Sequence, residues 1–372
     1  MSIKVFTYHA NTPNKIVGEV GKFDDRIIDG YTDWFSDNLG FEPTDNVQEV
    51  LAQDIKIACV PVYFDRIVPQ SFDFTQFDLL LFSEPDHASI DAVNAWIEEK
   101  NIAWYCKYLI MLGSWEVGNF KNLTVPSNVV LRPYYAYQLL DKFDPADNNP
   151  TEPLYNFEAL LGSRKDHRDF VMAKMQTSGL LEQSLVTYRR NFSNVDFVRD
   201  HARQYITQEV LQGQDLNYPY VSPLIGDTDQ DAVAQGATIM PWSVLNHARY
   251  SIITESYPEG AVILSEKTGK AILAKKLFVM FGARYALHYL REFYGFKTFS
   301  GIINESYDDI RDNFERWSAA WEQVEWLAKQ DPNKVAKLTA PIIEHNYNRF
   351  FELKAERSTQ AFNLIQEQVS LC

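Results

Sequence analysis

The segment from Tyr250 to Gly282 reads YSIITESYPEGAVILSEKTGKAILAKKLFVMFG. Its opening run, 250–254, is rich in β-branched and aromatic residues and predicts a buried strand. After a loop, Ser265 stands at the N-cap position of a predicted helix, 266–274, and the apolar run 277–281 predicts the next strand. This order favours a parallel sheet covered by helices. The first strand's end and the helix start are therefore expected at the carboxyl edge of the sheet, where ligands bind.

The same alternation of apolar runs and helical patterns extends along the chain. Further strands are predicted at 3–8, 55–63, 78–82, 102–112, 129–131, 157–161, 184–188 and 296–299, and further helices at 88–99, 166–178, 284–293, 306–330 and 332–369. Turn-forming residues between Asp141 and Pro153 indicate a boundary. The pattern predicts an α/β fold with two Rossmann-like, doubly wound domains, 1–145 and 153–330, and C-terminal helices at 331–372 that pack across them.

Composition narrows the class of protein. With 372 residues, the chain exceeds the usual size of one hydrophobic core, and its 46% hydrophobic residues are typical of a globular protein. The formal net charge of −15 disfavours nucleic acid as a partner. Three widely spaced cysteines, a start without signal-peptide features and the lack of a long uncharged apolar run predict a cytoplasmic protein without a membrane span.

Two charged residues open the predicted helix after Ser265. The Glu266 carboxylate could hold ribose hydroxyls, and the Lys267 ammonium could neutralise a diphosphate together with the unpaired N–H groups of the helix start. In the alternative interpretation, the Ser265 to Thr268 sequence and Glu266 only cap the helix and satisfy its dipole.

The strand ending in Glu255 and Ser256, followed by Ser265, Glu266 and Lys267 at a helix start, resembles the donor-binding region of B-type glycosyltransferases. The fucosyltransferase-like members are the most similar, although Asn is common in that family where Ser256 stands. The resemblance implies that domain 153–330 binds a nucleotide-sugar and that 1–145 forms the acceptor side. It also implies that Glu266 engages the ribose and Lys267 the phosphates of the donor.

A basic turn follows the predicted strand 157–161 and opens the next helix. In enzymes of this type, such a turn commonly brings a basic residue to the donor phosphates, and the resemblance makes Arg164, Lys165 and Arg168 the candidates. The alternative is a solvated basic loop without a binding role.

An inverting transferase also needs a base to activate the acceptor hydroxyl. Glu84 follows the predicted strand 78–82 and is the candidate. The alternative is that Glu84 is a turn residue and that Asp86 caps the next helix. A retaining enzyme would need no such base.

The sequence thus predicts a metal-independent glycosyltransferase that uses a nucleotide-sugar as co-substrate and no other cofactor. The acidic run Asp227, Asp229 and Asp231 lacks the features of a calcium loop and is interpreted as a solvated loop. The acceptor class includes a glycan, a small molecule or modified DNA. Two alternatives stay open: a non-catalytic α/β binding module of the same fold, and a transferase that glycosylates a modified base in DNA.

Overall fold

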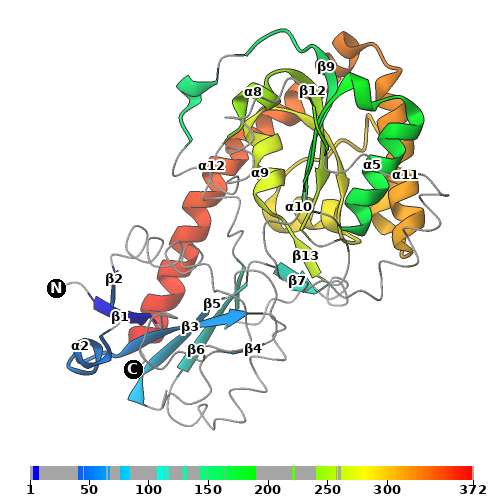
Figure 1. Cartoon of the computed structure of the whole chain (residues 1–372). Coiled ribbons are helices and arrows are strands. Elements are labelled where there is room, and N and C mark those ends of the chain that lie inside the picture. Colours follow the sequence, from blue (N-terminus) through cyan, green and yellow to red (C-terminus); the bar gives the residue numbers. More distant parts are fainter. Residues whose placement is uncertain are drawn as a thin grey trace. The chain divides into compact units, whose positions relative to one another are not determined.

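A computed structural model describes the chain in two compact units, Met1–Tyr134 with Leu353–Cys372, and Tyr135–Glu352 (Figure 1). The described residues are 3–7, 41–44, 46–63, 66–67, 76–83, 107–112, 114–116, 129–131, 143–148, 150–163, 165–189, 220–222, 240–256, 258 and 261–370. The predicted helix 88–99 lies outside them. Both units are built on a mainly parallel sheet, which confirms the predicted α/β class.

The first unit holds a sheet in the order β2–β1–β3–β5–β6–β8, in which all these strands run parallel. Its described elements are β1 (Ile3–Thr7), β2 (Phe41–Thr44), α2 (Val47–Leu51), β3 (Ile57–Tyr63), β4 (Arg66–Ile67), β5 (Leu79–Ser83), β6 (Lys107–Leu112), β7 (Ser114–Glu116) and β8 (Val129–Leu131). β4 pairs antiparallel with β3. The consecutive residues Ile57 and Ala58, and likewise Leu79 and Leu80, are fully buried, as expected for strands enclosed on both faces.

The second unit holds a sheet in the order β11–β10–β9–β12–β14. Its parallel strands are β9 (Tyr155–Ser163), β10 (Ser184–Arg189), β12 (Ala248–Thr254) and β14 (Leu277–Phe281). The short edge strand β11 (Tyr220–Val221) pairs antiparallel with β10. From β9 the chain winds to β10 on one side, and from β12 it winds to β14 on the other. A topological switch point therefore lies between β9 and β12.

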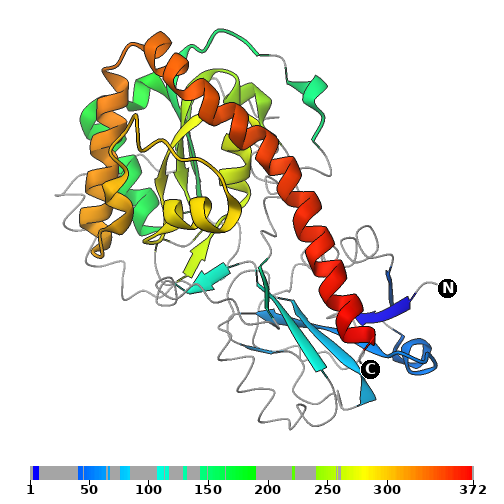
Figure 2. The same cartoon turned by 180° about the vertical axis from the view of Figure 1, so that it is seen from behind.

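The helices of the second unit cover both faces of this sheet. α5 (Asp166–Ser178) and α11 (Asn313–Ala328) lie on one face, and α9 (Glu266–Leu273) lies on the opposite face (Figures 1 and 2). The remaining elements of this unit are η4 (Pro145–Asp147), η5 (Leu181–Gln183), α8 (Trp242–Leu245), β13 (Ala261–Ile263), α10 (Ala286–Tyr294) and η6 (Glu305–Asp309). The Phe170 ring on α5 packs on the rings of Phe281 and Trp317, with centroids 6.3 and 6.0 Å away. Aromatic side chains thus join sheet and helices in the core.

One predicted element of the second unit is wrong, and a second is right only in part. The segment 296–299 is not a strand, because side chains form hydrogen bonds with its backbone N–H and C=O groups. The Asn346 side chain bonds both the N–H and the C=O of Lys297, and the Phe299 N–H donates to Glu305. The predicted helix 306–330 is confirmed over α11, 313–328, but its first residues belong to the 3-10 turn η6. The helix begins later because Asp312 caps it by accepting from the N–H of Glu315.

The C-terminal helix α12 (Pro332–Ser370) confirms the helix predicted at 332–369. Its residues up to Glu352 belong to the second unit, where Arg349 donates to the Tyr294 carbonyl (2.7 Å) and so caps the end of α10. Among the helices within the described ranges, none is long and apolar enough to cross a bilayer.

Candidate functional site

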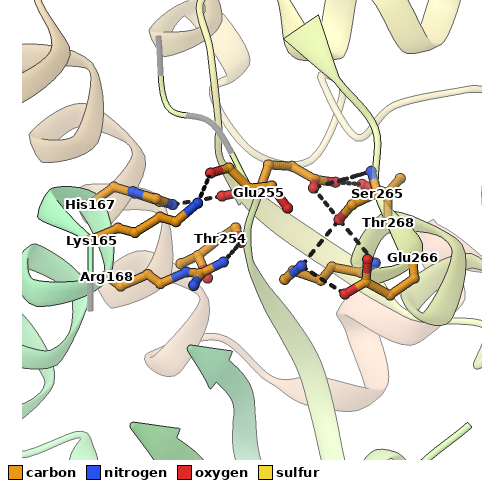
Figure 3. Close-up of polar contacts among 10 residues, drawn as sticks. Lys165, His167, Arg168, Thr254, Glu255, Ser265, Glu266 and Thr268 are labelled. Carbon is orange, nitrogen blue, oxygen red and sulfur yellow. Dashed lines mark hydrogen bonds and ion pairs between the residues drawn. The ribbon is translucent and has the colours of Figure 1, made fainter. Parts of the chain in front are cut away.

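Three predicted segments meet at the carboxyl edge of the second unit's sheet (Figure 3). The first turn of α5 follows the end of β9, residues 254–256 are the last residue of β12 and the two that follow it, and residues 265–268 are the N-cap and first turn of α9. β9 and β12 are the two strands that flank the switch point. In open parallel sheets, ligands bind outside the carboxyl ends of the strands at a switch point, so this edge is the candidate site.

Glu255 lies at the centre of the site and is 0% exposed. Both oxygens of its carboxylate lie 3.2 Å from the N–H of Ser265. The hydroxyl of Ser265 also donates to the Glu255 carboxylate, as does the hydroxyl of Thr268 at 2.5 Å. Burial raises the pKa of Glu255, while the nearby Lys267 charge and the two hydroxyl donors act in the opposite direction. The structure therefore places this predicted donor-binding carboxylate inside the protein, where it joins β12 to α9.

The start of α9 carries the two charged residues that the sequence singled out. Ser265 is the N-cap, as predicted, and its hydroxyl oxygen accepts from the N–H of Lys267 (3.3 Å). The Lys267 ammonium lies 2.7 Å from the Glu266 carboxylate and 3.3 Å from the Ser265 hydroxyl. The two charged side chains are 18% and 16% exposed, so ligand atoms can reach them.

Glu266 is held in its ionised form by charge. Burial alone would raise the pKa of Glu266, but the positive charges of Lys267 and Lys270 outweigh burial, and the pKa is lowered. The residue therefore presents a carboxylate that accepts hydrogen bonds at neutral pH.

Side chains at the start of α5 form hydrogen bonds with the backbone at the end of β12. Lys165 donates to the Ser256 carbonyl (2.5 Å), and the His167 ring Nε2 lies 2.8 Å from the Glu255 carbonyl oxygen. Arg168 Nη2 lies 3.5 Å from the Thr254 carbonyl oxygen. Three side chains at the start of α5 thus form hydrogen bonds with three consecutive backbone carbonyls, those of residues 254–256. Sequence reasoning did not foresee this use of the basic turn.

Arg168 is 4% exposed, so the alternative interpretation of a solvated loop is wrong for this residue. Burial lowers the pKa of Arg168 to about 10, although the carboxylates of Glu266, Glu255 and Asp169 favour its charged form. Lys165 is half-buried, and Arg164 lies outside the described residues. Arg168 therefore contributes a buried positive charge behind the site.

His167 is a site residue that sequence reasoning missed. Burial, and then the charges of Arg168 and Lys165, lower its pKa well below the usual value, so the ring is neutral. With Nε2 donating to the Glu255 carbonyl, Nδ1 is the acceptor nitrogen, and it has no hydrogen-bond partner among the residues that the structure describes. The sequence did offer one indication of this role, because His167 lies in the turn after β9 that was predicted to bind the donor through its basic residues.

A second group of buried charges lies on and next to α9. Glu158 on β9 and the lysines 270 and 276 are nearly inaccessible to water, and the Lys276 ammonium donates to the Ala248 carbonyl. Burial lowers the pKa of Lys270 and of Lys276 to about 8, while Glu158 favours their charged forms. Burial also raises the pKa of Glu158. Of these three residues, Lys270 contributes positive charge that acts on Glu266.

The remaining predicted residues cannot be placed at this edge. Glu84 and the acidic run 227–231 lie outside the described residues. Within the part of the chain that the structure describes, no group of three or more His, Cys, Asp or Glu side chains could hold a metal ion.

No protein-family model matches the chain, and no curated protein matches it. Among solved structures, the chain is similar to one described as the DNA modifying enzyme β-glucosyltransferase in the presence and absence of the substrate uridine diphosphoglucose. The two chains are 11% identical, each is covered over 100% of its length, and the TM-score is 0.42. A likeness of this size assigns neither a family nor an activity.

Proposed function

We propose that this protein is a glycosyltransferase that moves a sugar from a nucleotide-sugar donor to an acceptor hydroxyl. The donor would bind at the carboxyl edge of the second unit's sheet. One observation carries the proposal: Glu266 and Lys267 form a partly exposed pair, 2.7 Å apart, at the start of α9, beside the switch point between β9 and β12.

The chemistry of this pair suits the two polar parts of a nucleoside diphosphate. An ionised carboxylate accepts hydrogen bonds from neighbouring ribose hydroxyls, and Glu266 is kept ionised by Lys267 and Lys270. An ammonium group at a helix N-terminus favours a phosphate through its charge and through the helix dipole. Lys267 therefore has the position and the charge to bind the diphosphate.

The proposed reaction is a displacement at the anomeric carbon. The acceptor oxygen forms a bond to that carbon, the bond to the diphosphate oxygen breaks, and its electron pair leaves with the nucleoside diphosphate. The acceptor's proton passes to a base, for which Glu84 remains the candidate in an inverting reaction. Lys267 and the helix start would stabilise the negative charge that develops on the leaving group, so we propose that the reaction needs no metal.

A binding experiment tests the donor site directly. UDP-, GDP-, ADP-, CMP- and TDP-sugars are screened by thermal shift, and the donor that stabilises the protein most is titrated calorimetrically into three proteins. These are the wild type, Glu266→Gln and Lys267→Ala. Each variant loses a charge-assisted hydrogen bond, so Kd should rise about tenfold or more.

Matched controls come from exposed positions of the same unit. Glu322 on α11 and Lys337 on α12 are exposed, so Glu322→Gln and Lys337→Ala should leave Kd unchanged. The proposal fails if no nucleotide-sugar stabilises the wild type, or if both site variants keep its affinity.

Turnover separates catalysis from binding. Release of the nucleoside diphosphate is measured with the bound donor and with glycan, small-molecule and modified-DNA acceptors. Binding without any release, with or without acceptor, would favour a non-catalytic module over the proposed transferase.

A further inference from the structure

We propose that Glu255 is a positioning residue: its buried side chain holds the start of α9, and with it Glu266 and Lys267, in the donor-binding arrangement without touching the donor. This inference rests on the proposed function for the identity of the ligand. It departs from the sequence-based expectation that Glu255 contacts the donor itself.

The surroundings of the carboxylate leave no room for a ligand contact. Glu255 is fully buried, and the two residues that donate to it, Ser265 and Thr268, are also buried. Three donor groups point at the two oxygens: the Ser265 N–H, the Ser265 hydroxyl and the Thr268 hydroxyl (Figure 3). A donor molecule would have to displace these contacts to reach the carboxylate.

The backbone of Glu255 is held as firmly as its side chain. Its N–H donates to the Phe281 carbonyl at the end of β14 (3.1 Å), and its carbonyl oxygen lies 2.8 Å from His167 Nε2. The neighbouring carbonyls of Thr254 and Ser256 accept hydrogen bonds from Arg168 and Lys165. The residue is thus anchored to β14 and α5, and its side chain extends that anchor to α9.

Ser265 connects the Glu255 carboxylate to Lys267, one of the two proposed donor-binding residues. Its hydroxyl donates to Glu255, while its oxygen lies 3.3 Å from both the N–H and the ammonium of Lys267. A change in the Glu255 carboxylate therefore alters the orientation of Lys267 through one intervening atom. Burying a carboxylate costs free energy unless it is fully hydrogen-bonded. We therefore infer that Glu255 serves to hold the start of α9 in place and not to stabilise the fold.

Two variants test the proposal, and each has a matched control. Glu255→Gln keeps the shape but replaces one acceptor oxygen with an amide, and Thr268→Val removes a single buried hydroxyl. Glu182 and Thr177 are exposed residues of the same unit, so Glu182→Gln and Thr177→Val serve as controls.

The first readout needs no ligand. Amide hydrogen exchange is measured in full-length wild type and variants, with melting temperature as a check on folding. The N–H groups of Ser265 and Lys267 should exchange about tenfold faster in Glu255→Gln, and less so in Thr268→Val, while the controls match the wild type. Unchanged exchange at both amides would overturn the proposal, whatever the ligand is.

The second readout uses the donor chosen by the thermal-shift screen and its 2′-deoxy and 3′-deoxy ribose analogues. Positioning predicts that Glu255→Gln and Thr268→Val raise Kd for all three ligands by about tenfold, which corresponds to about 1.4 kcal/mol. The ratio of affinities between donor and analogues should stay as in the wild type, and kcat at saturating donor should change little. In Glu266→Gln that ratio should fall, because Glu266 is the proposed ribose contact.

A fall of the same ratio in Glu255→Gln would show a direct ribose contact and overturn the positioning role. If the wild type binds none of the donors, the proposed function fails, and hydrogen exchange still decides whether Glu255 holds α9. The two failures are therefore distinguishable.

Discussion

Replacing Ser265 with alanine should destabilise the second unit far more than the loss of an ordinary N-cap. The hydroxyl has two roles: it accepts from the N–H of Lys267 as the cap, and it donates to the buried Glu255 carboxylate. Loss of a cap lowers the free energy of unfolding by about 1 kcal/mol. Loss of a hydrogen bond to a buried charged group adds about 1.5–3 kcal/mol. The sum is about 3 kcal/mol, and the partly exposed contact with the Lys267 ammonium adds little.

Urea denaturation of the full chain measures this change, followed by far-UV circular dichroism and by tryptophan fluorescence. The second unit contains four of the chain's eight tryptophans, Trp242, Trp317, Trp321 and Trp326, so part of the fluorescence change reports on its unfolding. Ser178 on α5 is exposed, and Ser178→Ala should change the free energy of unfolding by less than about 0.5 kcal/mol. A loss below about 1 kcal/mol in Ser265→Ala would refute the reasoning, since the cap alone would account for it.

A second substitution at the same position separates capping from the contact with Glu255. Aspartate is as good an N-cap as serine in ordinary helices. At position 265 it would place a second carboxylate against the buried carboxylate of Glu255, which should destabilise the protein more than alanine does. Wild-type stability in Ser265→Asp would show that the helix start is an ordinary cap and that Glu255 does not depend on it.

Two further predictions concern residues next to the site. Gly162 has a φ of 60°, and an added Cβ would lie 3.4 Å from Arg168 Nη1, so Gly162→Ala should lower the free energy of unfolding by about 1 kcal/mol or more in urea denaturation. Gly301→Ala is the control and should have a smaller effect, because an added Cβ there would meet no atom of the described residues within 4 Å apart from its chain neighbours. Because the pKa of Lys276 falls from 10.5 to about 8 on folding, the unfolded chain binds more protons between these values, and stability should rise with pH across this window. Lys276→Met should reduce that rise when unfolding is measured from pH 8 to 10.5, and an equal rise in both proteins would contradict the assignment.

The local structure of the site could be predicted from sequence, because it depends on neighbouring residues. The apolar run before Glu255 correctly predicted strand β12, and Ser265 was correctly predicted as the N-cap of α9. The apolar run after that helix correctly predicted β14. The long-range contacts could not be predicted. Glu255 was expected at a ligand because it ends a strand, but the side chain of a strand-end residue can turn inward as well as outward. Its burial depends on hydroxyls 10 and 13 residues further along the chain.

The first turn of α5 shows the same difficulty in another form. His167, Arg168 and Asp169 are consecutive polar residues and all are buried, whereas hydrophobicity would assign such a run to the surface. Their burial is explained only by what they meet, which is the carbonyls at the end of β12 and, for Asp169, the hydroxyl of Tyr188 at 2.6 Å. A sequence shows these polar residues, but their hydrogen-bond partners lie elsewhere, at the end of β12 and on β10.

Stability alone does not explain the charges at this edge. A partly exposed ion pair such as that of Glu266 and Lys267 contributes little to folding, and a buried carboxylate such as Glu255 is often less favourable than an apolar side chain of the same shape. Both nevertheless converge on the first turn of one short helix, and the buried group fixes the exposed ones through Ser265. An arrangement that gives up stability to fix an acid and an ammonium group side by side is expected where the protein must bind hydroxyls next to an anion. A nucleoside diphosphate presents these groups together, and for this reason we propose the donor site at the start of α9.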